Sequence, residues 1–183
     1  MMATGQSLER KPTKAAEGSF DLREYCAADF DRLWEIDQLC FPPGIAYTQM
    51  ELSGFLTARN AITLVAQLQR NRQGGATVPR SNDDHTQAIV GYVVAHAIRR
   101  KYGRILTLDI HPHARRLGLA TALMSTCEAR LRSLGCGEVY LETAVDNAAA
   151  VSLYRKLGYR ILRTLPGYYS SHSLDAFQMG KQL

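Results

Sequence analysis

The 183-residue chain has no run approaching the roughly 18 consecutive apolar residues that a membrane-spanning helix needs. Its first residues are polar and basic and lack the apolar segment of a secretory signal, so we expect a cytoplasmic protein without an export leader. The four cysteines form no CxxC pair and no Cys/His cluster with zinc spacing. We therefore expect no metal site, and reduced thiols buried as small apolar side chains.

The chain carries more basic than acidic residues. Lys and Arg number 22 against 17 Asp and Glu, which gives a net charge of +5 and a pI near 9.1. This excess favours an anionic partner, such as nucleic acid, an acidic peptide or a phosphorylated cofactor. The sequence lacks the aromatic and basic alternation of an RNA-binding sheet, so we expect no nucleic-acid partner.

The composition, 46% hydrophobic and 21% charged, is that of an ordinary globular domain. Residues 1–18 are polar and show no periodicity, which predicts a mobile tail. Residues 19–183 are expected to form a single domain, interrupted by a polar, glycine-rich loop at 70–86 that we predict to be flexible.

Hydrophobic periodicity predicts alternating strands and helices along the domain. The segments with strand character are 20–25, 61–66, 88–98, 105–110, 139–143, 159–165 and 175–179. The segments with helical spacing are 29–39, 48–58, 115–134 and 147–157. The strand–helix–strand–helix–strand order of 105–165 predicts parallel neighbours joined by right-handed crossovers. We therefore expect an α/β (α+β) fold.

The most informative segment joins strand 105–110 to the next helix and reads LDIHPHARRLGLAT from Leu108 to Thr121. A helix N-terminus exposes unpaired N–H groups and partial positive charge, and phosphates bind there. Gly118 permits close approach of the backbone to an anion, while Arg115 and Arg116 add charge. Taken alone, a segment of this kind is more often a solvated helix start with a packing glycine.

Two better-known phosphate motifs are excluded at this turn. A Walker A loop needs a Gly-Lys-Ser/Thr ending, which is absent. A dinucleotide-binding fingerprint needs three glycines, of which only Gly118 is present.

Arg115-x-x-Gly118-x-Ala120 resembles the Q/R-x-x-G-x-G/A signature of the GNAT superfamily of N-acetyltransferases, and it follows a strand as in that family. A second stretch is similar to another signature of the superfamily and reads Glu142-x-x-x-x-Asn147-x-x-Ala150-x-x-x-Tyr154-x-x-x-Gly158-Tyr159. The two signatures cover residues 105–159. The resemblance implies a GNAT fold, with a mixed, mostly antiparallel sheet of about seven strands, a central parallel pair and about four helices.

Within the superfamily the chain resembles the RimI-like protein N-terminal acetyltransferases. The residues that carry this likeness are Glu142, Asn147 to Ala150, Leu153, Tyr154, Gly158, Tyr159, Tyr168, Tyr169, Asp175, Ala176, Phe41 and Pro42. RimI acetylates the N-terminal alanine of a small-subunit ribosomal protein. The resemblance thus implies a protein or peptide N-terminus as acceptor, and a ribosomal protein in particular.

The resemblance also implies acetyl-CoA as the co-substrate, with its pyrophosphate at the turn before helix 115–134. The residues implied there are Arg115, Arg116, Leu117, Gly118, Leu119, Ala120 and Thr121. The backbone of Leu108, Asp109 and Ile110 would pair with the pantetheine arm as an added strand does. Asn147 would hydrogen-bond that arm from the far side.

By resemblance, Glu142 is the general base, acting through water, and Tyr154 protonates the departing thiolate. A structural salt bridge remains an alternative for Glu142, and core packing or orientation of the thioester remains one for Tyr154. An α-amine has a pKa near 8, against about 10.4 for lysine, so a modest carboxylate base suits a peptide N-terminus better. No cysteine nucleophile is needed, because direct attack in a ternary complex forms no covalent intermediate.

The resemblance places Phe41, Pro42, Tyr47, Tyr168 and Tyr169 in the acceptor slot, although each could instead be core or surface packing. Some eukaryotic relatives use a tyrosine on the strand before the anion turn as part of the base. This chain reads Gly-Arg-Ile at 103–105, so Glu142 would act without that tyrosine.

Three other functions compete with this interpretation. An acetyltransferase for a small amine would need a closed acidic pocket, and few acidic residues occur at 41–47. A regulatory module that binds CoA without catalysis would not need both Glu142 and Tyr154. A basic nucleic-acid binder would show affinity that falls steeply with salt and no thioester turnover.

Overall fold

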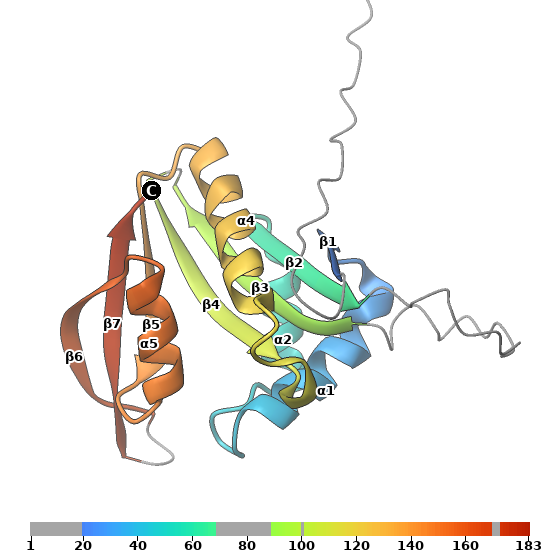
Figure 1. The fold of residues 1–183 in the computed structure, drawn as a ribbon, viewed down its shortest axis with the longest axis horizontal. Coiled ribbons are helices and arrows are strands. Elements are labelled where there is room, and N and C mark those ends of the chain that lie inside the picture. The colour runs from blue at the N-terminus through green and yellow to red at the C-terminus, as the bar shows by residue number, and fades with distance from the viewer. Residues whose placement is uncertain (1–19, 69–88, 100, 170–172) are drawn as a thin grey trace, which may run out of the picture.

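The computed structural model describes residues 20–68, 89–99, 101–169 and 173–183. They form one seven-stranded sheet in the order β1-β2-β3-β4-β5-β7-β6 (Figure 1). Its strands are β1 (Phe20–Glu24), β2 (Ala61–Leu68), β3 (Ile89–Ile98), β4 (Tyr102–Ile110), β5 (Glu138–Ala144), β6 (Arg160–Tyr169) and β7 (Leu174–Gln182). The predicted tail 1–18 and loop 70–86 lie outside the described residues.

Four α-helices connect the strands: α1 (Phe30–Cys40), α2 (Gln49–Thr57), α4 (Leu119–Ser133) and α5 (Ala148–Lys156). Thr48 caps α2 in a capping box with Glu51, and the side chain of Asn147 caps α5 by accepting from the Ala150 N–H. The prediction that a helix starts at 115 is wrong, because Arg116 and Gly118 have φ angles of 65° and 80°. These left-handed residues cannot join a right-handed helix, so α4 starts at Leu119.

The sheet separates two apolar cores. On one face α4 packs against β2, β3 and β4, and the buried residues there include Leu123, Leu131 and Tyr154. On the other face α1 and α2 cover β2, β3 and β4 around Leu33 and Tyr92. Figure 1 shows α4 and α5 in front of the sheet and α1 and α2 behind it.

The central parallel pair is β4 and β5, and the other neighbours in the sheet are antiparallel. This confirms the predicted mixed, mostly antiparallel sheet. The second expected parallel neighbour does not form, because the C-terminal strand β7 lies between β5 and β6. A segment that arrives last in the chain can enter the sheet there, and a local strand–helix pattern gives no sign of it. Among the described helices, none is long and apolar enough to cross a bilayer.

Candidate functional site

The strands β4 and β5 pair only near their N-terminal ends, and the pairing stops where Arg104 lies opposite Tyr140. Beyond this point they diverge (Figure 1), while β4 stays paired with β3. The His111 N–H donates to the Val90 carbonyl at 2.8 Å. Hydrogen-bonding direction alternates along an antiparallel ladder, so the N–H and C=O of Leu108 turn toward β5. They have no strand partner among the residues that the structure describes, and can pair with an added extended chain.

The two other predicted backbone contacts on β4 are placed differently. By the same alternation, the backbone of Asp109 faces β3, where it lies opposite Tyr92. The Ile110 carbonyl faces the opening, but it accepts from Arg115 Nε at 3.2 Å and from Cys40 Sγ at 3.4 Å. Of the predicted pantetheine-binding backbone groups, those of Leu108 are therefore the best placed.

A bulge at Leu106 gives β4 a further exposed group. The register with β3 shifts between the pairs Val94 with Thr107 and Ala95 with Ile105, which leaves Leu106 without an opposite residue. Its carbonyl accepts from the Tyr47 hydroxyl at 3.1 Å. The segment between α1 and α2 is thereby tied to the point where β4 and β5 separate.

The N-terminus of α4 follows β4 after a short connection that contains a 3-10 turn at Pro112–Ala114, and it has no side-chain cap. The Ala122 N–H donates to the Gly118 carbonyl at 3.0 Å, so the amides of Leu119, Ala120 and Thr121 have no partner within the helix. Gly118 is exposed, and a Cβ built on it would meet nothing within 4 Å. Unpaired amides, an aligned helix dipole and open space at the glycine fit the pyrophosphate of acetyl-CoA.

Gly118→Asp is expected to weaken acetyl-CoA binding more than tenfold relative to Gly118→Asn. Both side chains tolerate the left-handed backbone at this position and have nearly the same size. The aspartate alone adds a negative charge, at the point where the anionic pyrophosphate is expected. Isothermal titration calorimetry with CoA checks this pair of variants, and equal affinities would place the pyrophosphate elsewhere.

The two predicted cations at this turn, Arg115 and Arg116, make different contacts. The exposed Arg115 is turned back toward β4 by its hydrogen bond to Ile110, whereas Arg116 is exposed at the turn itself. On the far side of the opening, Asn147 uses its side-chain oxygen to cap α5, which leaves its amide N–H₂ for a ligand.

Glu142 lies in a row of polar side chains that crosses four strands. Its Oε2 accepts from Arg104 Nε at 3.1 Å and forms an ion pair with Arg104 Nη2 at 3.0 Å, and its Oε1 accepts from Gln178 Nε2 at 3.0 Å. Arg163 Nε donates to Gln178 Oε1 at 2.9 Å. Gln178 lies opposite both Glu142 and Arg163 in the sheet register. The salt-bridge alternative for Glu142 is therefore realised, and the carboxylate is held at both oxygens.

The row lies on the sheet face opposite α4. A Cβ at Gly103 would meet Leu131 of α4 at 2.5 Å, so the adjacent side chain of Arg104 points to the other face. Sequence reasoning did not assign a role to Arg104 or Gln178. Both residues alternate with buried neighbours along their strands, a pattern that predicts an exposed strand face. Only the sheet register, however, shows that they contact Glu142.

The three predicted slot tyrosines lie near this row. The Tyr168 hydroxyl accepts from Arg104 Nη2 at 3.1 Å, and the Tyr168 and Tyr169 rings are 5.1 Å apart at 83°. Burial, followed by the nearby Tyr168 and Glu142, raises the pKa of Tyr169 to about 12. Burial also raises the pKa of Tyr47, with contributions from Asp109, Tyr168 and Tyr169. Phe41 and Pro42 follow α1 directly, and their place in the slot stays a prediction.

Tyr154 approaches from the other sheet face, because its side chain belongs to the core beneath α4. Its ring lies 5.8 Å from that of Tyr159, whose hydroxyl donates to Glu128 Oε1 at 2.9 Å. Lys181 Nζ donates to Glu128 Oε2 at 2.7 Å. These two hydrogen bonds of Glu128 hold the Tyr159 ring in place beside Tyr154. Glu142 and Tyr154 can meet a common ligand only where β4 and β5 separate.

A buried polar cluster lies under α1, near the bulge. Asp109 Oδ1 accepts from Thr107 Oγ1 at 2.6 Å, and the Tyr92 hydroxyl lies close enough to act on the same carboxyl, whereas Asp37 Oδ1 has no partner within the described ranges. Burial raises the pKa of Asp109 to about 7, against the opposing hydrogen bonds from Thr107 and Tyr92. Burial likewise raises the pKa of Asp37 to about 6. Sequence reasoning assigned Asp109 through its backbone and gave no sign of this carboxyl pair.

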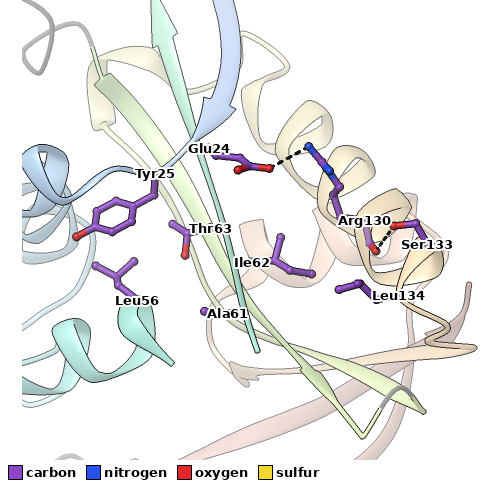
Figure 2. Close-up of a pocket in the computed structure, with 9 residues that line it drawn as sticks. All are labelled: Glu24, Tyr25, Leu56, Ala61, Ile62, Thr63, Arg130, Ser133 and Leu134. Atoms are coloured by element: carbon purple, nitrogen blue, oxygen red, sulfur yellow. Dashed lines mark hydrogen bonds and ion pairs between the residues drawn. The ribbon is translucent and has the colours of Figure 1, made fainter. Parts of the chain in front are cut away.

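A hollow of about 300 Å³ lies at another place in the fold, between β2 and the C-terminal end of α4. Figure 2 shows the Glu24–Arg130 ion pair on one side of it, with Tyr25 and Leu56 on the other. None of the predicted site residues lines this hollow. Within the described ranges, no group of three His, Cys, Asp or Glu side chains is placed to hold a metal ion.

Comparison with known proteins places this geometry in a family. Residues 30–159 match the acetyltransferase (GNAT) family. An N-alpha-acetyltransferase of Saccharolobus solfataricus is 30% identical over 175 residues, which cover 90% of this chain and 93% of that protein. The histone acetyltransferase MCC1 of Arabidopsis thaliana is 31% identical over 171 residues, covering 81% of this chain. The chain spans 64% of the length of MCC1, and 50% of that of an N-alpha-acetyltransferase of Sulfurisphaera tokodaii.

Two solved structures share the fold. Arabidopsis thaliana NAA60 in complex with acetyl-CoA has a TM-score of 0.74 at 22% identity, covering 90% of this chain and 99% of that one. The ribosomal-protein-S18-alanine N-acetyltransferase of Escherichia coli has a TM-score of 0.71 at 18% identity, covering 89% and 93%. The predicted resemblance to N-acetyltransferases, RimI among them, is confirmed at the level of family and fold. With the family match spanning most of the domain, the chain belongs to the acetyltransferase (GNAT) family.

Proposed function

We propose that this protein transfers the acetyl group of acetyl-CoA to the free α-amine of a protein N-terminus. The observation that carries the proposal is the opening between β4 and β5, which Glu142 approaches from one sheet face and Tyr154 from the other. An amine that arrives on the Glu142 side would meet a thioester held from the α4 side. Direct attack in a ternary complex needs this arrangement of two substrates held in line.

Acetyl-CoA supplies an activated acetyl thioester. The unpaired amides at the start of α4 bind its pyrophosphate, and the free N–H and C=O of Leu108 pair with its extended arm. Asn147 offers its amide N–H₂ from the opposite side. These contacts fix the position of the thioester relative to Glu142 and Tyr154.

Glu142 accepts the proton that the acceptor ammonium loses, directly or through one water. Its carboxylate is 9% exposed and is held by Arg104 and Gln178, so it is oriented before the acceptor arrives. An α-amine with a pKa near 8 is already partly neutral at physiological pH. Glu142, paired with the Arg104 guanidinium, is therefore a sufficient base for a peptide N-terminus. A lysine side chain, with a pKa of about 10.4, would require a stronger base.

Tyr154 acts as a hydrogen-bond donor to the thioester sulfur. Burial, followed by the charge of Asp109, raises the pKa of Tyr154 above its ordinary value of 10.0. A thiol has a pKa of about 8.5, so complete proton transfer from this tyrosine to the thiolate is unfavourable. A neutral hydroxyl that stabilises the developing negative charge on sulfur fits these values better than a full proton donor.

Tyr154→Phe is expected to lower kcat by about 10- to 100-fold while leaving acetyl-CoA affinity nearly unchanged. A hydrogen bond to a charged group is worth about 1.5–3 kcal/mol, and the phenylalanine keeps the ring contact with Tyr159. Single-turnover kinetics with bound acetyl-CoA measures this step. A loss smaller than about threefold would leave Tyr154 with a packing role only.

The Saccharolobus solfataricus relative named an N-alpha-acetyltransferase supports an α-amine acceptor. The aromatic side chains Tyr47, Tyr168 and Tyr169 beside Glu142 support a peptide over a small amine, because they offer rigid contact area with hydroxyl groups. A ribosomal protein with an N-terminal alanine is the more specific proposal. It rests on the RimI-like residues of the sequence, namely Glu142 and the segment from Asn147 to Tyr159.

The test is release of free CoA thiol from acetyl-CoA with a panel of acceptors. The panel contains peptides that begin with Ala, Ser or Met, an N-terminally blocked lysine peptide, and spermidine. Turnover restricted to free α-amines is the expected result, and preference for Ala would support the ribosomal acceptor. Turnover on spermidine alone would make the protein a small-amine acetyltransferase, and turnover on the lysine peptide alone would exclude the N-terminal acceptor.

A further inference from the structure

Arg104 is the one cation whose side chain contacts Glu142 within the described residues. Its Nε donates to Glu142 Oε2, while its Nη2 forms an ion pair with the same oxygen and donates to the Tyr168 hydroxyl. The side chain is 43% exposed, so it stands at the surface of the slot. Burial acts to lower the pKa of Arg104, but the charges and hydrogen bonds of Glu142 and Tyr168 together raise this pKa above its ordinary value. Its positive charge is therefore permanent at any pH at which the protein works.

The groups that face Arg104 come from several elements. They are Glu142 and Tyr140 from β5, His96 from β3 and Tyr168 from β6. His96 Nε2 lies 2.9 Å from the Phe55 carbonyl of α2, which can only accept a hydrogen bond from it. Arg163 joins the row only through Gln178, so Arg104 is the cation in direct contact with Glu142.

We propose that Arg104 is a positioning residue that sets the pH range of acetyl transfer, by holding Glu142 as an oriented carboxylate and placing a permanent positive charge beside the attacking amine. This inference rests on the proposed function, because it assigns Arg104 to the same acceptor site. It goes beyond that function because it assigns the pH dependence of the reaction to the charge of Arg104, in addition to its hydrogen bonds.

The sign of the effect follows from the acceptor amine, which must lose a proton before it attacks. The permanent positive charge of Arg104 disfavours the ammonium form of an amine that is bound beside it. Removing the charge therefore moves the acid limb of the rate profile to higher pH. A charge within about 4–6 Å shifts titration by about 1–3 pH units, and the partial exposure of Arg104 points to the lower end of that range.

The experiment compares the pH dependence of kcat, which reports groups in the enzyme–substrate complex, for the wild type, Arg104→Met and Arg104→Lys, with both a free-α-amine peptide and acetyl-CoA at saturation. Arg104→Met is expected to move the acid limb up by about one pH unit. Arg104→Lys keeps the charge but loses the two-pronged contact, so the limb should stay in place while the rate falls by about three- to tenfold. Arg132→Met removes an equal charge from an exposed position on α4 and controls for net charge.

A profile for Arg104→Met that falls equally at every pH would overturn the inference and leave Arg104 a structural role. If Arg104→Met fails to fold by circular dichroism, Arg104→Gln serves as the neutral variant under the same criterion. A wild type that acetylates no α-amine in the panel would refute the proposed function, and this inference with it. An active wild type with an unshifted neutral variant would refute this inference alone.

Discussion

Glu142→Gln is expected to lower kcat/KM for a peptide acceptor by about 10²- to 10³-fold, with little change in acetyl-CoA affinity. The amide cannot accept the ammonium proton, whereas the cofactor contacts at α4 and Leu108 are untouched. The defect should shrink as the pH rises past the α-amine pKa near 8, because the acceptor then arrives already neutral. Steady-state kinetics between about pH 6 and pH 10 measures both effects.

The structure supplies two matched controls for this variant. Glu138→Gln removes the same charge four residues earlier on β5, where the half-buried carboxylate accepts from Gln182 at 3.3 Å and lies beside Tyr140. It should leave kcat/KM within about twofold, because Glu138 lies where β4 and β5 are still paired. The second control is the exchange Glu142→Gln with Gln178→Glu, which moves the carboxylate one strand along the row. The amide introduced on β5 can donate to the carboxylate introduced on β7, which still accepts from Arg163.

The exchanged double variant separates catalysis from structure. It keeps the net charge and a complete set of hydrogen bonds, so its Tm should return toward that of the wild type. Its turnover should stay low, because the carboxylate now lies one strand farther from the β4–β5 opening. Turnover that recovers together with Tm would show that Glu142 is needed only for the fold, and the base would have to be sought elsewhere.

The elements that define the fold could be predicted from the sequence because their signals are local. Thr48 and Asn147 cap helices through their own side chains, and strand alternation depends only on neighbouring residues. The position of β7 between β5 and β6 is a long-range choice that no local pattern encodes. The later start of α4 has a different cause, since the left-handed backbone of Arg116 shows no sequence signal comparable to that of glycine.

The candidate site divides in the same way. Glu142, Tyr154 and the turn at Gly118 belong to contiguous motifs and could be proposed from spacing and resemblance. Arg104 and Gln178 lie 38 and 36 residues from Glu142 in sequence, and only the sheet register brings them to it. The mixed sheet thus builds the acceptor side from four strands, whereas the cofactor side comes from one continuous strand–turn–helix segment. For that reason the cofactor side could be predicted from the sequence more completely than the acceptor side.

Asp109→Asn is expected to stabilise the protein at pH 8 by about 4 kcal/mol and to change its stability little at pH 4. Burial raises the pKa of Asp109 from 3.8 to about 7, so folding favours the protonated carboxyl. The wild type therefore loses stability through this group as the pH rises from about 4 to about 7, and no more above that. Asparagine keeps an acceptor for Thr107 Oγ1 and carries no charge, so the loss disappears.

Urea denaturation of the two proteins at pH 4, 6 and 8 checks this prediction, with Asp31→Asn on the exposed first turn of α1 as a control. The difference between Asp109→Asn and the wild type should grow with pH, while that for Asp31→Asn should remain small and constant. A constant difference would mean that Asp109 stays ionised in the fold, with its charge stabilised by the Tyr92 hydroxyl and by water. A gain at pH 8 would instead identify Asp109 as a buried carboxyl that the protein retains at a cost in stability. Comparing the acetyl-transfer rates of the two proteins at pH 8 would then test whether the Asp109 carboxyl is needed for activity.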